Sequence, residues 1–150
     1  MSLILEVYPG DALIINDASI RFRNRATVEL TAHARFLVGK QIMPPGQATS
    51  PARRIYFAMQ TAYIGNEEER VEGLSRAREL VAAFKSATTS ALARSILDRA
   101  LDFAATGEGH QALKLARRIM QHEDDVLGVA VGLADERTHA AAGAERPTTH

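Results

Sequence analysis

The spacing of apolar residues changes at one point in the chain, and this change constrains the fold more than any other feature. Up to residue 42 the apolar side chains come in short runs or alternate with polar ones, as in half-buried β-strands. The segment Met43-Pro44-Pro45-Gly46 then interrupts the pattern. From Ser50 onward apolar residues recur every three or four positions, which is the helical period. The sequence therefore predicts an α+β protein.

The N-terminal part, residues 1–48, is predicted to form a small antiparallel β-sheet. Turn residues such as Pro9-Gly10-Asp11 separate its short apolar runs. The expected strands cover residues 3–7, 12–15, 19–23, 27–30 and 36–38. In the third strand the alternation predicts that Ile20 and Phe22 face a core and that Arg21 and Arg23 share the opposite face.

Residues 49–133 are predicted to form a four-helix region packed on the β part. Ser50-Pro51 is a strong start signal, because Ser caps a helix and Pro suits its first turn. Gly65 should end this helix, and Asn66 and Glu69 have the spacing of a capping box for the next one. Two further helices are expected over residues 90–105 and 110–127. The side chains expected to face inward in the last three helices are Val71, Leu74, Val81, Phe84, Leu92, Ile96, Ala100, Phe103, Leu113, Ala116, Ile119 or Met120, and Leu127.

The last residues differ in composition from the rest of the chain. No large apolar residue follows Leu133, so residues 134–150 are predicted to be a disordered C-terminal tail. No apolar run reaches the ~18–20 residues of a membrane span, and the N-terminus lacks the features of a signal peptide. No membrane association and a cytoplasmic location are expected.

Motifs for catalysis or for cofactor binding are missing from the sequence. There is no Cys, no phosphate-binding glycine loop and no pair of His residues at zinc-binding spacing. His122 precedes three acidic residues, a pattern interpreted as a solvated helix end. Asp98 and Asp102 lie one turn apart, and Arg94 and Arg99 beside them favour an exposed, salt-bridged face over acid–base chemistry. We expect no enzyme, no cofactor and no metal site.

Basic residues are concentrated in one part of a chain whose net charge is zero. Residues 18–66 contain seven basic residues and only one acidic residue, Glu29. This segment is a candidate anion-binding surface, and an ordinary solvated sheet face is the alternative. Its basic residues are Arg21, Arg23, Arg25, Arg35, Lys40, Arg53 and Arg54.

Several segments resemble one protein family in the same order along the chain. Thr49 to Gln60, which reads TSPARRIYFAMQ, resembles the "TPARRIYFALQ" signature of the FlbT family of bacterial flagellin regulators. Tyr8 to Asn16 is similar to the family's "KPGEK…ING" opening, and Gly39 to Met43 is similar to its "GKDIM" element. Ala112 to Glu123 matches the general character of the family's last helix, so the resemblance covers roughly residues 1–128.

This resemblance implies a post-transcriptional regulator of flagellin synthesis. It would bind the 5′ untranslated region of flagellin mRNA, repress translation and promote decay of the mRNA, although some members of the family act as activators instead. Phosphates would meet the seven basic residues named above. Tyr56, one heptad before Tyr63, could stack on a base, although core packing of both rings is the favoured alternative.

Two questions about the role of this chain stay open at the level of sequence. Instead of RNA, the chain could bind flagellin or another flagellar assembly protein, or it could form a homodimer through a sheet edge. Arg53 and Arg54 lie in the first turn of their helix, where positive charge opposes the helix dipole. Phosphate capture or pairing with Glu6, Asp11 or Asp17 would compensate, and pairing is favoured for one of the two.

Overall fold

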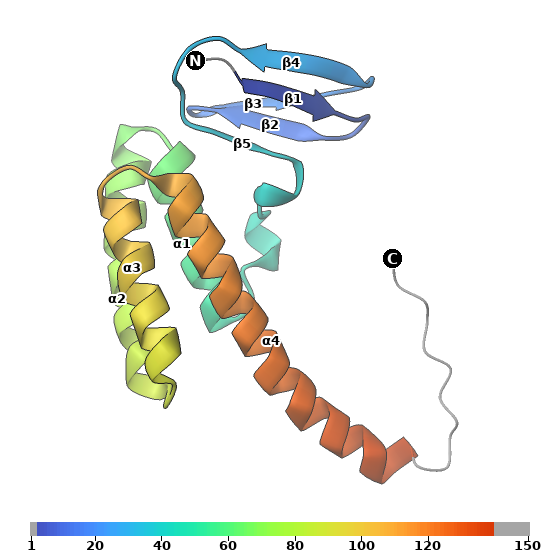
Figure 1. Ribbon diagram of the computed structural model, residues 1–150, viewed down its shortest axis with the longest axis vertical. Helices are drawn as coiled ribbons and strands as arrows, with labels where there is room; N and C mark the ends of the chain where they lie inside the picture. The colour runs from blue at the N-terminus through green and yellow to red at the C-terminus, as the bar shows by residue number, and fades with distance from the viewer. Residues whose placement is uncertain (1–2, 140–150) are drawn as a thin grey trace.

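The computed structural model describes residues 3–139, with side chains for residues 3–128, and it confirms the predicted α+β class (Figure 1). The strands are β1 (Leu3–Val7), β2 (Ala12–Ile15), β3 (Ala18–Arg21), β4 (Ala26–Leu30) and β5 (Phe36–Val38). Two 3-10 helices follow, η1 (Gly39–Gln41) and η2 (Pro45–Gln47). The α-helices are α1 (Pro51–Ile64), α2 (Glu67–Ala87), α3 (Ala91–Ala105) and α4 (Gly109–His139).

The strands form two antiparallel sheets where one was predicted. In the first, β1 pairs with β4, with Leu3 opposite Leu30. In the second, β2 lies between β3 and β5. The turn between β1 and β2 explains the difference, because the N–H of Gly10 donates to the carbonyl of Phe22 at 2.8 Å. The turn is thus bonded to the end of β3 and does not close a β1–β2 hairpin.

The prediction that Ile20 faces a core is wrong, since 41% of this residue is exposed. It lies on β3, the edge strand of the second sheet, and all four residues of β3 are exposed. Phe22 follows the strand and is half-buried. The core of this lobe instead depends on Val7 and Leu13, which are 0% and 1% exposed.

The predicted helix starts are confirmed. The Ser50 hydroxyl accepts the N–H of Arg53 at 3.3 Å, with Pro51 in the first turn. Asn66 and Glu69 form the reciprocal capping box, with both hydrogen bonds at 2.9 Å. These caps satisfy N–H groups that have no partner inside the helix. The four helices form a bundle in which helices next to each other in the sequence run antiparallel, and the sheet lobe lies at one end (Figure 1).

Three of the predicted inward-facing residues, Val71, Leu92 and Leu127, are exposed. Val71 is 69% exposed, because it lies about 200° around α2 from Gly73, which faces α1. Leu92 is 65% exposed, because it lies about 100° around α3 from Ala93, at the edge of the stripe of Ala93, Ile96 and Ala100 that packs in the core. Leu127 is 53% exposed, at the end of α2 beside Ala87 and Thr88.

Strand β5 and the segment that follows it pack into the core of the bundle. Leu37 of β5 is fully buried within the cluster formed by the helices. The side-chain amide of Gln60 forms two hydrogen bonds to the backbone of Met43, in the segment that joins the two parts. The N–H of Phe36 donates to Tyr63 Oη at 3.4 Å, which ties β5 to the end of α1.

Helix α4 is longer than predicted and runs past the ends of α2 and α3 (Figure 1). It ends at His139, so residues 134–139 of the predicted disordered tail are helical. Residues 140–150 lie outside the described part of the chain.

Candidate nucleic-acid interface

The eight predicted RNA-binding residues occupy different parts of the molecule. Arg21, Arg23 and Arg25 lie at the end of the sheet lobe where β1 meets β2 and β3 meets β4 (Figure 1). Arg35 precedes β5 at the opposite end, and Lys40 lies in η1. Arg53, Arg54 and Tyr56 belong to α1. The basic segment of the sequence therefore does not form one continuous surface.

At the strand end, Arg25 differs from its two neighbours. Its Nε donates to Glu6 Oε1 at 2.9 Å, its guanidinium forms a salt bridge with the same carboxylate, and it lies 5.3 Å from the centre of the Tyr8 ring. Arg21 and Arg23 are exposed, and among the side chains of residues 3–128 no carboxylate pairs with either of them. We refer to Arg21 and Arg23 as the hairpin cations. Their charge is available to an anionic ligand.

Arg35 is partly buried in the contact between the two lobes. Its carbonyl accepts the N–H of Asn16 at 2.6 Å, and its own N–H donates to Asn16 Oδ1 at 3.3 Å. Its side-chain Nε is buried and has no hydrogen-bond partner among the described residues. The guanidinium is close enough to Tyr63 to oppose the effect of burial, which raises the pKa of that tyrosine. Arg35 is therefore half-buried, whereas the hairpin cations are exposed.

The two arginines at the start of α1 have different roles. Arg53 donates from Nη1 to Asp124 Oδ1 at 3.0 Å and from Nη2 to Asp124 Oδ2 at 3.1 Å, and it also lies 3.4 Å from Glu123. The hydrogen bonds with Asp124 raise the pKa of Arg53. Internal pairing is confirmed for one arginine, but the predicted partners in the sheet lobe are wrong. The start of α1 lies beside α4, at the far end of the bundle from the sheets (Figure 1). Arg54 is exposed.

The Tyr56 ring is buried and offers no face to a base. The residue is 2% exposed, its hydroxyl donates to the Gln41 carbonyl at 2.8 Å, and it accepts from Arg117 Nη2 at 3.0 Å. Tyr63 is also buried, at 9% exposure. The alternative that both rings pack in the core is therefore correct, and Tyr56 leaves the set of candidate RNA contacts.

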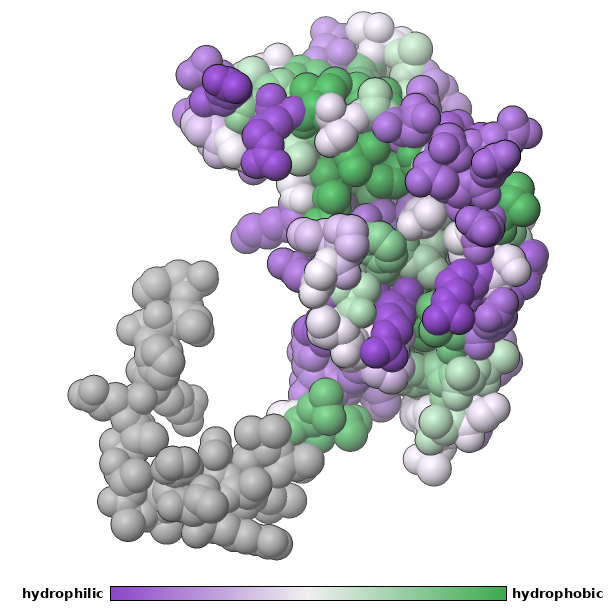
Figure 2. Space-filling view, turned by 180° about the vertical axis from the view of Figure 1, so that it is seen from behind, coloured by the Kyte–Doolittle hydropathy of each residue, from purple (hydrophilic) through white to green (hydrophobic). Residues whose placement is uncertain are grey.

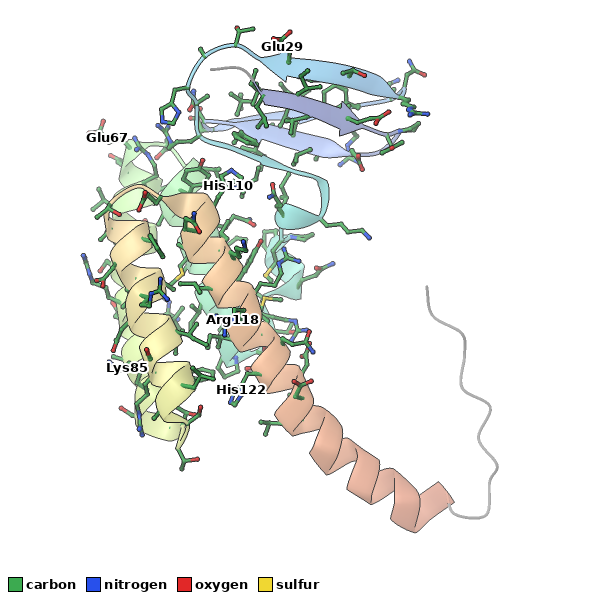
Figure 3. All side chains as sticks on the ribbon, in the orientation of Figure 1. Glu29, Glu67, Lys85, His110, Arg118 and His122 are labelled. Carbon is green, nitrogen blue, oxygen red and sulfur yellow. The ribbon has the colours of Figure 1, made fainter. Side chains whose placement is uncertain are left out.

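Helix α4 carries basic residues that the sequence interpretation missed. Lys114, Arg117 and Arg118 are exposed and lie on one side of the helix, at positions i, i+3 and i+4 (Figure 3 labels Arg118). We call these three residues the α4 stripe. Arg117 Nη2 donates to the main-chain carbonyl of Lys40 at 3.5 Å, which places the backbone of η1 beside the stripe, and the Lys40 side chain is exposed. The i, i+3, i+4 spacing of the three residues could have revealed the stripe from the sequence. The net charge of residues 67–150 did not, because acidic residues outnumber basic ones there.

The residues considered for acid–base or metal chemistry have other neighbours. Asp98 pairs with Lys85 of α2 at 2.7 Å, where Arg94 and Arg99 of its own helix were expected. Among the described residues no group of three potential ligands could hold a metal ion. In the same part of the chain no helix combines the length and the apolar character that crossing a membrane requires.

The family model described as "Flagellar protein FlbT" matches residues 3–127 of the sequence. The chain belongs to the FlbT family. The flagellum biosynthesis repressor protein FlbT of Caulobacter vibrioides is 30% identical over 136 residues, which cover 85% of this chain and 91% of that protein. Probable repressors of the same name are 30% identical in Mesorhizobium japonicum, over 89% of this chain and 95% of the relative, and 27% identical in Agrobacterium fabrum, over 84% of both. No solved structure matches the chain.

The structure gives a physical role to the FlbT signature at residues 49–60. Ser50 caps α1, while the N–H of Ala52 donates to Glu123 Oε2 at 2.9 Å and Arg53 pairs with Asp124. Tyr56 and Gln60 bind the segment that connects the two lobes. The signature thus joins α1 to α4 and to the connecting segment, and most of it is structural.

Proposed function

We propose that this FlbT chain represses flagellum biosynthesis by binding the 5′ untranslated region of flagellin mRNA in the cytoplasm, so that translation is blocked and decay of the mRNA is promoted. The names of the relatives support the repressor role, since they are described as flagellum biosynthesis repressors. The observation that carries RNA binding is the exposure of the hairpin cations without a carboxylate partner among residues 3–128. Free guanidinium groups suit phosphate, because their planar donors bind two oxygens at once.

The proposed RNA path includes the α4 stripe and Lys40 as well as the hairpin cations. The segment after β5 connects the sheet lobe to the bundle (Figure 1). In the order of the sequence, Lys40 therefore lies between the hairpin cations and the α4 stripe. A single strand could contact phosphates along this route without any base being recognised in a pocket. Binding of this type weakens with salt, by a slope of about −0.7 in log–log units for each phosphate contact.

The test is a titration of labelled flagellin leader RNA with the wild-type protein, at low and at near-physiological salt, against a scrambled RNA. The variant Arg21→Glu/Arg23→Glu should bind at least about tenfold more weakly and with a shallower salt slope. The matched control is Arg78→Glu/Arg99→Glu, which makes the same change in net charge at exposed positions on α2 and α3. If the first variant binds like wild type, the hairpin cations are not the RNA site.

A further inference from the structure

Arg54 is the charged residue of the FlbT signature that has no side-chain partner among residues 3–128. The other polar side chains of residues 50–60 that were described above cap, pair or hold the connecting segment. Arg54 is exposed, and its side chain forms no hydrogen bond or salt bridge with any residue in the range 3–128. It also lies in the first turn of α1, where a positive charge opposes the helix dipole. A cation in this place points to an external partner.

A groove lies on both sides of Arg54. Two adjoining cavities of about 510 and 630 Å³ are both lined by Arg54 and Leu80. One extends between α1 and α2 to Gly73, and the other reaches Ala87 and the lower part of α4. From Gly73 to Ala87 the α2 wall is about 20 Å long, which is the length of roughly four helical turns. We call these two adjoining cavities together the α1–α2 groove.

The walls of the groove are mainly apolar around Arg54. Val126 and Leu127 are 58% and 53% exposed where they line it, and Phe84 faces them from α2. Figure 2 shows hydrophobic atoms at the lower end of the helical lobe, on the face opposite to that of Figure 1. Apolar walls of this kind favour a protein ligand over RNA, which needs several cations along its backbone.

Two charged residues that line the groove, Arg54 and Glu72, have no salt-bridge partner among the described residues. Glu123 is held by Arg53 and by the N–H of Ala52. In the other cavity Arg76 pairs with Glu79 at 3.3 Å, and Glu72 lies toward the end away from α4. Next to Phe84, Val126 and Leu127, Arg54 is therefore the permanent charge that lacks a described partner. A complementary ligand would present an apolar stripe and one carboxylate.

We propose that the α1–α2 groove binds an amphipathic α-helix of a partner protein, which places an acidic side chain against Arg54. The apolar stripe of the ligand helix, at positions i, i+3, i+4 and i+7, would contact Leu80, Phe84 and Leu127. Neither the hairpin cations nor the residues of the α4 stripe line this groove. Binding of a helix and binding of RNA are therefore distinct activities of the same chain.

The probes are labelled peptides of about 15 residues, long enough to span the groove as a helix. The first has a Leu stripe at the stated spacing with one Glu at its centre, and the second replaces that Glu with Lys. The third has the composition of the first with the Leu residues scattered. Fluorescence anisotropy should show that wild type prefers the Glu peptide to the Lys peptide by about tenfold or more, because like charges repel at a contact. The scattered peptide should bind weakest.

The variant Arg54→Glu should reverse the preference between the Glu and Lys peptides. It should also fold, because Arg54 is exposed and an acidic residue suits the first turn of a helix. Arg78→Glu is the control, since Arg78 is exposed on α2 and does not line the groove. An unchanged preference in Arg54→Glu, or no binding of either stripe peptide, overturns the proposal. So does weaker binding of leader RNA by Arg54→Glu with no effect on the peptides, which would assign Arg54 to the RNA path.

Discussion

The side chain of Gln60 forms hydrogen bonds with both backbone polar groups of Met43. The N–H of Met43 donates to Gln60 Oε1 at 2.7 Å, and Gln60 Nε2 donates to the carbonyl of Met43 at 2.9 Å. Both residues are buried, at 5% and 7% exposure. Met43 belongs to no sheet, and the Gln60 amide provides the two hydrogen bonds that a neighbouring strand would otherwise make. These bonds attach the segment between the two lobes to α1.

Replacing Gln60 with Leu should destabilise the protein by about 2–4 kcal/mol, because two buried backbone groups of Met43 lose their partners. The side-chain volume changes little, so the loss reports the hydrogen bonds. Urea unfolding followed by circular dichroism measures it. The control is Gln121→Leu, at an exposed position on α4, which should change stability by less than about 0.5 kcal/mol. Equal losses in the two variants would show that the Gln60 amide is not special.

Glu123 should contribute more to stability than Asp125, two residues further along α4. Only 10% of the Glu123 side chain is exposed, and it accepts the N–H of Ala52 while pairing with Arg53. Asp125 is exposed and bonds to Gln121 within its own helix. Removing Glu123 leaves a helix-start N–H without a partner, so Glu123→Ala should lower the free energy of unfolding by about 1–2 kcal/mol more than Asp125→Ala. Thermal unfolding of both variants measures the difference. Equal midpoints for Glu123→Ala and Asp125→Ala would contradict the prediction.

Two glycines in helices should respond to alanine in opposite ways. A Cβ on Gly73 would lie 2.7 Å from the backbone N of Ala62 and 3.0 Å from the carbonyl O of Ala58, so α1 and α2 would have to separate. Gly73→Ala should therefore cost about 1–3 kcal/mol. A Cβ on Gly128 would meet nothing within 4 Å, and Gly128→Ala should gain up to about 1 kcal/mol from helix propensity. Chemical denaturation of both variants tests the contrast, and a stabilised Gly73→Ala would refute the close approach of the helices.

The sequence predicted the local features of this fold well. Ser50, Asn66 and Glu69 act within three residues of their own positions, so their caps follow from spacing alone. The break at Met43-Pro44-Pro45-Gly46 likewise separates strands from helices, because Pro restricts its own backbone and that of its neighbours. The sequence pattern did not predict that β1 pairs with β4 in one sheet while β2 belongs to another, because this pairing joins strands that are far apart in the sequence.

The fate of each basic residue depended on contacts between distant parts of the chain. Arg53 and Arg54 are adjacent and equivalent in sequence, but one of them meets Asp124, 71 positions later, and the other lies in a groove. One residue of helix rotates a side chain by about 100°, which is enough to place one arginine in an ion pair with α4 and to leave the next as an unpaired, exposed cation. Tyr56 shows the same limit, since its partner Arg117 is 61 positions away. The candidate site therefore needed the tertiary structure.

The last prediction concerns pH and His110, whose ring lies against two aromatic residues. The ring centre is 4.7 Å from that of Phe36 and 5.4 Å from that of Tyr63, and Nε2 is buried with no hydrogen-bond partner among the described residues. Burial lowers the pKa of His110 below its usual value of 6.5. The unfolded chain therefore binds this proton more readily than the folded one. The contribution to stability is complete above pH 6.5 and is lost as the pH falls below that value.

We expect the free energy of unfolding to decrease between about pH 6.5 and pH 5.5, a window in which ordinary carboxylates stay ionised. For a single histidine the slope is at most about 1.4 kcal/mol per pH unit. His110→Phe keeps an aromatic ring in the contact and should flatten the slope, whereas the control His33→Gln, at an exposed position before β5, should leave it as in wild type. Urea unfolding at several pH values across this window gives the pH slope of the free energy of unfolding for each variant. If His110→Phe retains the wild-type slope, another group takes up the proton and the aromatic contact of His110 does not control it.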